Sequence, residues 1–211
     1  MDCNTLHDSK FDSVVAAVPD RVAGHARVLG IDLGTHCGVS IIDIPRNKPL
    51  SAMILLAGQL DLTLGEYDTG PLRFIRLKHF LAVVRPTLIG YEEVRFTPKT
   101  EGMSGKPIGM IIARVASASE LLGAMKVTVA TWAAEHDVAT QGYGIGTIKK
   151  AATGKGNANK VEMITAANQQ FGVHLEPENY ESSGHDNIAD AMFVSYLAAR
   201  DYLEGLHADS T

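Results

Sequence analysis

The sequence predicts an α/β fold in which helices cover both faces of a mixed sheet. Three observations support this prediction. Short apolar runs typical of strands come first, segments with helical periodicity then alternate with further strand-like runs, and 45% of the 211 residues are apolar. This apolar content supplies a core of ordinary size for one compact domain, so a second full domain is not expected.

Three strands are predicted first. A short apolar run at 28–32 is followed by Gly34 and by a second run at 38–44, which indicates two strands joined by a tight turn. A third strand candidate covers 52–62. We therefore expect a three-stranded antiparallel meander.

Helices and strands alternate in the rest of the chain. Apolar residues recur at helical spacing between Pro71 and Pro86, and again from Ile108 to Trp132. The β-branched segment 126–131 would by itself also suit a strand. The complete expectation is a helix over 71–85, a strand over 87–94, a loop over 95–107, a helix over 108–136, a strand over 138–148, a helix that Asn157 or Asn159 caps and Gly172 ends, and a last helix over 186–206.

The chain is expected to divide into a loosely ordered extension over 1–25 with at most one short helix, one domain over 26–206 and a short tail over 207–211. Its N-terminus has neither the basic region nor the long apolar run of a signal peptide, and no stretch approaches the length of a membrane span. The two cysteines are too few for a disulfide framework. We therefore expect a soluble protein of a reducing cytoplasm, with no membrane partner.

Charge is unevenly distributed along the sequence. The net charge of −5 argues mildly against a nucleic-acid partner, but segments 71–85 and 144–160 each carry four basic residues and no acid. Segment 173–190 instead carries five acidic residues and neither Lys nor Arg. An acidic centre flanked by basic segments suits metal-dependent chemistry on phosphodiesters.

Four acidic residues stand on segments that one fold could bring together. Asp32 and Glu92 end apolar strands, and Asp186 and Asp190 share one face of the last helix because they are four residues apart. Carboxylates that converge in the interior repel one another unless a cation lies among them, and ligation by oxygen alone selects Mg²⁺ or Mn²⁺. Two such ions about 3.5–4 Å apart can activate water and stabilise the leaving oxygen in phosphodiester cleavage.

Each acid also has a purely structural interpretation. Asp186 could serve only as the N-terminal cap of the last helix, and Glu93 is expected to be a solvated strand residue on the side opposite Glu92. The joint occurrence of acids on the first strand, the fourth strand and the last helix is what favours a metal centre.

Four sequence blocks in this order resemble the RuvC family of Holliday-junction resolvases, within the ribonuclease H-like superfamily. The resemblance extends over residues 27–205, and its lysine- and glycine-rich third block is the most discriminating. The blocks are 28–35 (VLGIDLGT), 90–94 (GYEEV), 148–160 (IKKAATGKGNANK) and 186–191 (DNIADA). The resemblance implies a ribonuclease H-like mixed five-stranded sheet, and the departures from the family pattern suggest a divergent, phage-borne member.

The resemblance implies that Asp32, Glu92 and Asp190 are catalytic metal ligands for two Mg²⁺ ions, with Mn²⁺ as a substitute. The fourth ligand is open, because the family places Asp or His three residues before the last Asp, where this chain has Asn187. We favour Asp186, since three-back and four-back positions adjoin on a helix. His185 is a candidate for proton transfer, although a histidine at this place is more often only a loop residue.

The resemblance also implies contacts with branched DNA. Lys149 and Lys160 match family lysines near the scissile phosphate, and Phe96 occupies the place of an aromatic residue that probes the junction. The other candidates for backbone contact are Lys150 and Lys155 in the third block and Arg95 and Lys99 in the loop after Glu92. A solvated basic loop and a core Phe are the structural alternatives.

These implications together predict a homodimeric, Mg²⁺-dependent endonuclease that resolves four-way junctions by paired symmetric nicks. The alternatives are a nuclease of the same fold acting on flaps, forks or RNA–DNA hybrids, and a junction-binding protein without cleavage. Residues 30–35 also look like the first phosphate motif of the actin and Hsp70 ATPases. Because 211 residues leave no room for the second lobe of those proteins, no nucleotide cofactor is expected.

Overall fold

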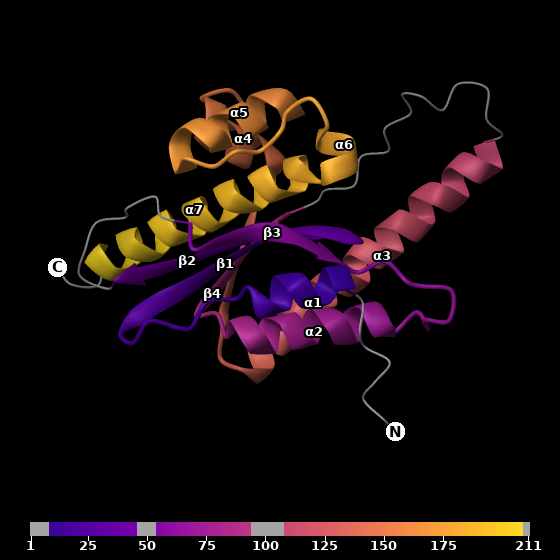
Figure 1. Ribbon diagram of the computed structural model, residues 1–211, viewed down its shortest axis with the longest axis horizontal. Coiled ribbons are helices and arrows are strands. Elements are labelled where there is room, and N and C mark those ends of the chain that lie inside the picture. Colours follow the sequence, from indigo (N-terminus) through magenta and orange to yellow (C-terminus); the bar gives the residue numbers. More distant parts are fainter. Residues whose placement is uncertain (1–8, 46–53, 94–107, 209–211) are drawn as a thin grey trace.

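The computed structural model describes residues 9–45, 54–93 and 108–208, which contain a mixed five-stranded sheet (Figure 1). The strands lie in the order β3-β2-β1-β4-β5, with the first three antiparallel and β1, β4 and β5 parallel. The predicted meander and fold class are thus confirmed. The strand bounds are β1 (His25–Asp32), β2 (His36–Pro45), β3 (Leu56–Asp61), β4 (Leu88–Glu92) and β5 (Ala139–Tyr143).

Helices cover both faces of the sheet, as the sequence predicts (Figure 1). One face carries α1 (Ser9–Ala16), α2 (Leu72–Val84) and α3 (Ile108–Glu135). The other carries α4 (Ile145–Thr153), α5 (Lys160–Phe171), α6 (Tyr180–Ser183) and α7 (His185–Ala208). Each face has its own apolar cluster. Within the described part of the chain, no helix is both long and apolar enough to cross a bilayer.

Two segments differ from the expected elements. The strand predicted over 138–148 ends at Tyr143, because Gly144 is the extended N-cap of α4 and the chain turns helical at Ile145. The β-branched segment 126–131 lies inside α3, so its alternative interpretation as a strand is wrong. In that segment, helical spacing of the apolar side chains outweighs local strand propensity.

The described part of the N-terminal extension, 9–24, contains one short helix, α1, and packs on the domain. Phe11 of α1 is only 3% exposed and joins the apolar cluster that α2 and α3 form on the sheet. The carbonyl oxygens of Pro19 and Asp20 accept hydrogen bonds from Arg27 at 2.9 and 3.0 Å. Residues 9–24 therefore belong to the folded domain.

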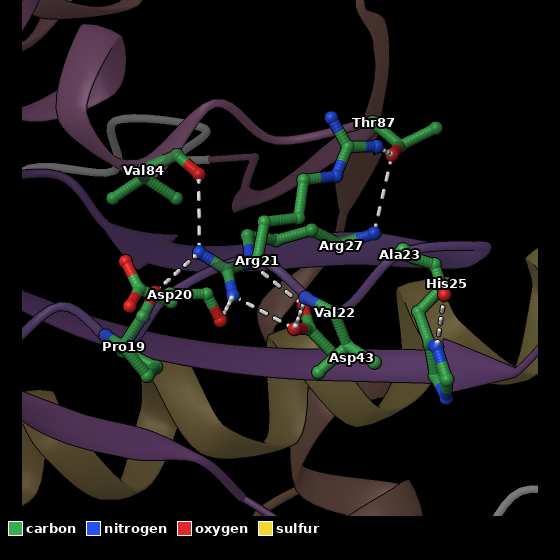
Figure 2. A network of polar contacts seen from close by, with 10 residues as sticks. All are labelled: Pro19, Asp20, Arg21, Val22, Ala23, His25, Arg27, Asp43, Val84 and Thr87. Atoms are coloured by element: carbon green, nitrogen blue, oxygen red, sulfur yellow. Dashed lines mark hydrogen bonds and ion pairs between the residues drawn. The ribbon is translucent and has the colours of Figure 1, made fainter.

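A buried ion pair fastens this segment to the sheet (Figure 2). The Arg27 guanidinium on β1 donates twice to the carboxylate of Asp43 on β2, at 2.7 Å in each bond. Arg27 is 1% exposed and Asp43 is 8% exposed. The geometry is bidentate and the remaining guanidinium N–H groups reach backbone carbonyls, so the desolvated charges are satisfied.

We expect Arg27→Ala to lower the free energy of unfolding by roughly 3–5 kcal/mol, because it leaves Asp43 buried without a counter-charge. Chemical denaturation in urea measures this change. Arg21→Ala is the matched control, since Arg21 is exposed and its hydrogen bond within the described ranges goes to the Thr87 hydroxyl. Equal losses in the two variants would contradict the assigned role of the buried pair.

Glycines let α7 lie directly on the sheet. A Cβ atom on Gly30 would stand 2.3 Å from the Ala191 carbonyl oxygen, and one on Gly38 would stand 1.8 Å from that of Asn187. Ser195, at the same crossing, shares a buried hydroxyl–hydroxyl hydrogen bond of 2.9 Å with Ser40 of β2. The backbone of α7 thus packs directly against the backbone of β1 and β2. The Ser40–Ser195 hydrogen bond fixes the position of the helix at this crossing.

Gly38→Ala should therefore destabilise the fold by roughly 3 kcal/mol, because the methyl group collides with the α7 backbone. Gly123→Ala is the matched control. Gly123 lies in α3 with nothing within 4 Å of its missing Cβ, so alanine there should be neutral or stabilising. Thermal unfolding followed by circular dichroism distinguishes the two, and a Gly38→Ala protein as stable as wild type would refute the close crossing.

Candidate functional site

The fold brings the four predicted acids to one edge of the sheet. Asp32 ends β1 and Glu92 ends β4, and these strands are parallel neighbours with Ile31 paired to Tyr91, so both carboxylates emerge at the same edge. Asp186 and Asp190 come from the first two turns of α7, which the close crossing at Gly30 holds over β1.

Electrostatic coupling among these acids is strong. Burial raises the pKa of Asp32 well above its ordinary value, and the charges of Asp190, Glu92 and Asp186 raise it further. Burial followed by the charges of Glu92 and Asp186 raises the pKa of Asp190 from 3.8 to about 7. Burial also raises the pKa of Glu92. The four residues therefore form one cluster, here called the acidic cluster, whose charged forms disfavour one another.

Two lysines of the basic block reach this cluster. Lys160, the first residue of α5, donates a short charge-assisted hydrogen bond to Asp186. Partial burial lowers the pKa of Lys160, but the bond and charge of Asp186 outweigh this and raise it. Lys149 of α4 opposes the raised pKa of Glu92 and, together with Lys160, that of Asp190. Both lysines thus supply positive charge to an otherwise acidic site.

Local capping fixes where the two lysines stand. Gly154 ends α4 in the left-handed conformation, with φ of 77°. Asn159 begins α5 with a capping box, in which its side chain accepts from the Glu162 N–H and the Glu162 carboxylate accepts from the Asn159 N–H. The block 148–160 is therefore a helix end, a tight turn and a helix start.

The chemistry of the acidic cluster suits a hard divalent cation. All four donors are carboxylates, and a positive ion among them would relieve the repulsion and desolvation that raise the pKa of Asp32 and Asp190. As the side chains stand, no group of three or more His, Cys, Asp or Glu residues in the described ranges is arranged to hold a metal ion. The cation that contacts Asp186 in this arrangement is the Lys160 ammonium.

The alternatives for the fourth ligand have different surroundings. The Asn187 side chain donates to the His36 carbonyl oxygen at 3.0 Å. The His185 ring accepts from the Glu176 N–H at 2.8 Å through Nδ1. Asp186 is the one of these three residues whose charge acts on Asp32 and Asp190. Its role as a ligand stays a prediction.

The other predicted DNA contacts are less closely tied to the cluster. Lys150 is exposed at the end of α4, and Lys155 in the following turn stands 3.6 Å from Glu162. The loop residues Arg95, Phe96 and Lys99 lie outside the described residues.

Sequence reasoning missed a polar cleft beside the acidic cluster. It measures about 410 Å³, and its lining includes His36, Gln59 and Asp61 from β2 and β3 together with Lys160 and Asp186. Antiparallel pairing of β2 with β3 sets His36 directly opposite Asp61, but the predicted strand over 38–44 begins after His36 and does not indicate this pair.

The raised pKa of Asp190 predicts how the stability of the metal-free protein depends on pH. Between about pH 4 and pH 7 the folded state retains a proton at Asp190 that the unfolded state has lost, so this contribution to stability falls as pH rises across that window. At pH 8 with a chelator, Asp190→Asn should raise the free energy of unfolding by at least about 1 kcal/mol, or roughly 2–4 °C in Tm. This gain in the free energy of unfolding should be smaller at pH 5, because Asp190 is then protonated in the folded state of the wild type. A gain that grows toward low pH would contradict the assignment.

Comparison with known proteins identifies the fold. Scans of protein-family models and of curated proteins both give no match. Among solved structures, a Thermus thermophilus RuvC in complex with a Holliday junction substrate superposes with a TM-score of 0.60 at 22% identity, covering 86% of this chain and 98% of that one. A second Thermus thermophilus RuvC structure gives a TM-score of 0.55 at 21% identity, with 87% and 96% covered. The chain thus has the mixed α/β fold of RuvC over most of its length.

Proposed function

We propose that this protein is a Mg²⁺-dependent, structure-selective DNA endonuclease that resolves four-way junctions by paired symmetric nicks. The observation that carries the proposal is the acidic cluster itself. Acids from β1, β4 and α7 meet at one edge of a RuvC-like fold, with Lys149 and Lys160 beside them. A purely structural role would not account for several carboxylates gathered where burial raises their pKa.

Asp32, Glu92, Asp186 and Asp190 are the residues that would hold two Mg²⁺ ions. The ions, when bound, supply water activation and charge stabilisation at the cleaved phosphate. Holding the cations is the task of the carboxylates. Lys149 and Lys160 would position the phosphate by charge, and Lys150 and Lys155 would follow the backbone without reading sequence.

Paired symmetric cutting requires two such sites related by a two-fold axis, so the proposal includes a homodimer. A monomer of this fold would instead nick flaps, forks or hybrids singly. The oligomeric state in solution, measured by light scattering, separates these two versions of a nuclease.

The decisive test uses a synthetic four-way junction with labelled opposing strands. Wild type with Mg²⁺ should nick both opposing strands at symmetric positions. Asp32→Asn and Asp190→Asn should still bind the junction but cut at least about a hundredfold more slowly, because each removes charge that a metal ion needs. Full cleavage by either variant would refute the metal-site assignment, and single unpaired nicks on many branched substrates would favour the alternative nuclease.

A matched pair of variants in one strand sharpens this test. Glu92→Gln should abolish cutting, whereas Glu93→Gln should not, because exposed Glu93 is outside the acidic cluster and its contact is Lys126 at 3.9 Å. Thermal shift gives an independent measurement. Mg²⁺ should raise the Tm of wild type and Glu93→Gln, but not that of Glu92→Gln.

A further inference from the structure

The polar cleft is continuous with the acidic cluster. Asp186 belongs to both, its partner Lys160 also lines the cleft, and the cleft extends from them toward the start of β2 and the end of β3. A strand of DNA whose phosphate lies at the acidic cluster would therefore have its neighbouring nucleotide near this cleft. This step rests on the proposed function.

The lining of the cleft is polar throughout its described part. His36, Gln59, Lys160 and Asn187 carry nitrogen atoms that can donate hydrogen bonds, and no aliphatic, Phe, Tyr or Trp side chain lines it. Sites that bind single-stranded bases use aromatic rings as stacking surfaces. His36 is the one ring among these described residues, so the cleft offers many more hydrogen-bonding groups than stacking surfaces and fits the sugar-phosphate part of a nucleotide better than its base.

The two acids of the cleft already have partners. Asp186 is bonded to Lys160. Asp61 accepts from the Thr63 N–H at 2.9 Å and from the Thr63 hydroxyl at 2.6 Å, and its Oδ1 lies 3.9 Å from Nε2 of His36. Their negative charge is thus partly offset before a ligand arrives.

His36 carries the one ring among the described residues that line the cleft, and this ring is half-exposed. Its side chain is 51% exposed, while Asp61 faces the ring and the Asn187 side chain holds the His36 backbone carbonyl. The bond from Asn187 thus holds the His36 backbone, while the half-exposed ring remains accessible to a ligand.

We propose that this cleft is a subsite for the sugar-phosphate unit next to the cleaved bond, and that His36, which stands beside Asp61, is its recognition residue. The chemical class of the ligand is a deoxyribose phosphate within a DNA strand. His36 acts in binding and positioning, not in the bond-breaking step.

The first experiment compares His36→Ala with His79→Ala, an exposed histidine on α2 on the other face of the sheet. With a four-way junction and Ca²⁺ in place of Mg²⁺, His36→Ala should weaken binding about tenfold, and Asp61→Asn should weaken it less. With Mg²⁺, His36→Ala should raise the junction concentration needed for half-maximal cleavage about as much as it weakens binding, whereas His79→Ala should match wild type in both measurements. His36→Gln, which keeps an N–H donor, should recover part of the affinity.

The second experiment does not depend on cleavage. Titration of the full-length, metal-free protein with the dinucleotide dTpT should shift the His36 ring resonances in NMR spectra, and the abasic analogue should shift them equally. Inorganic phosphate at the same concentration should shift them far less, because it lacks the sugar.

The outcomes separate the two proposals. If wild type cuts no branched DNA but dTpT still shifts His36, the endonuclease proposal fails and the subsite stands. If wild type cuts junctions while His36→Ala binds them like His79→Ala, the subsite is refuted. An unmoved His36 resonance, an equal shift with phosphate alone, or a shift that requires the base would also overturn it.

Discussion

The direct packing of α7 on the backbone of the sheet is the contact on which the candidate site depends. Gly30 and Gly38 leave no side chain between the helix and the central strands, so α7 crosses closer than an ordinary layer of side chains would permit. This closeness lets a carboxylate on the helix share an environment with Asp32 at the end of β1. The Ser40–Ser195 hydrogen bond sets the position of the helix at the crossing. The packing of α7 on the sheet therefore determines the geometry of the candidate site.

The burial and closeness of the carboxylates in the acidic cluster suit metal binding but destabilise the metal-free protein. Asp32 and Asp190 lie where burial and mutual repulsion oppose ionisation, which weakens the metal-free fold at neutral pH. The positive charges of Lys149 and Lys160 reduce this repulsion. Lys160 in particular contacts Asp186 in the arrangement described, so the chain itself contributes a positive charge beside carboxylates suited to a metal ion. Such internal compensation is typical of sites kept for function rather than for stability.

Much of the fold followed from the sequence because its signals are local. Strand-like runs, helical spacing and the caps at Asn159 and Gly172 predicted the sheet, α3 and α5 close to their observed bounds. The approach of the four acids was also predictable, since parallel β1 and β4 must end at the same edge. The helix α4 was missed, because its short segment after Gly144 has strand-like neighbours and no distinctive capping side chain. The polar cleft was missed for another reason. It depends on the seating of α6 and α7 against β2 and β3, and that seating is a tertiary property that no single segment encodes.

The hydrogen bonds from Arg27 to the N-terminal segment determine where the smallest fragment that can fold by itself begins. Backbone carbonyls of Pro19 and Asp20 complete the coordination of a guanidinium that has no access to water. A fragment that starts at residue 26, where the periodic apolar pattern starts, would expose that guanidinium and uncover the surface under Phe11. The smallest self-sufficient fragment must therefore include α1. Fusions and truncated variants should therefore keep Ser9–Ala16 intact, although this helix contributes none of the four acids.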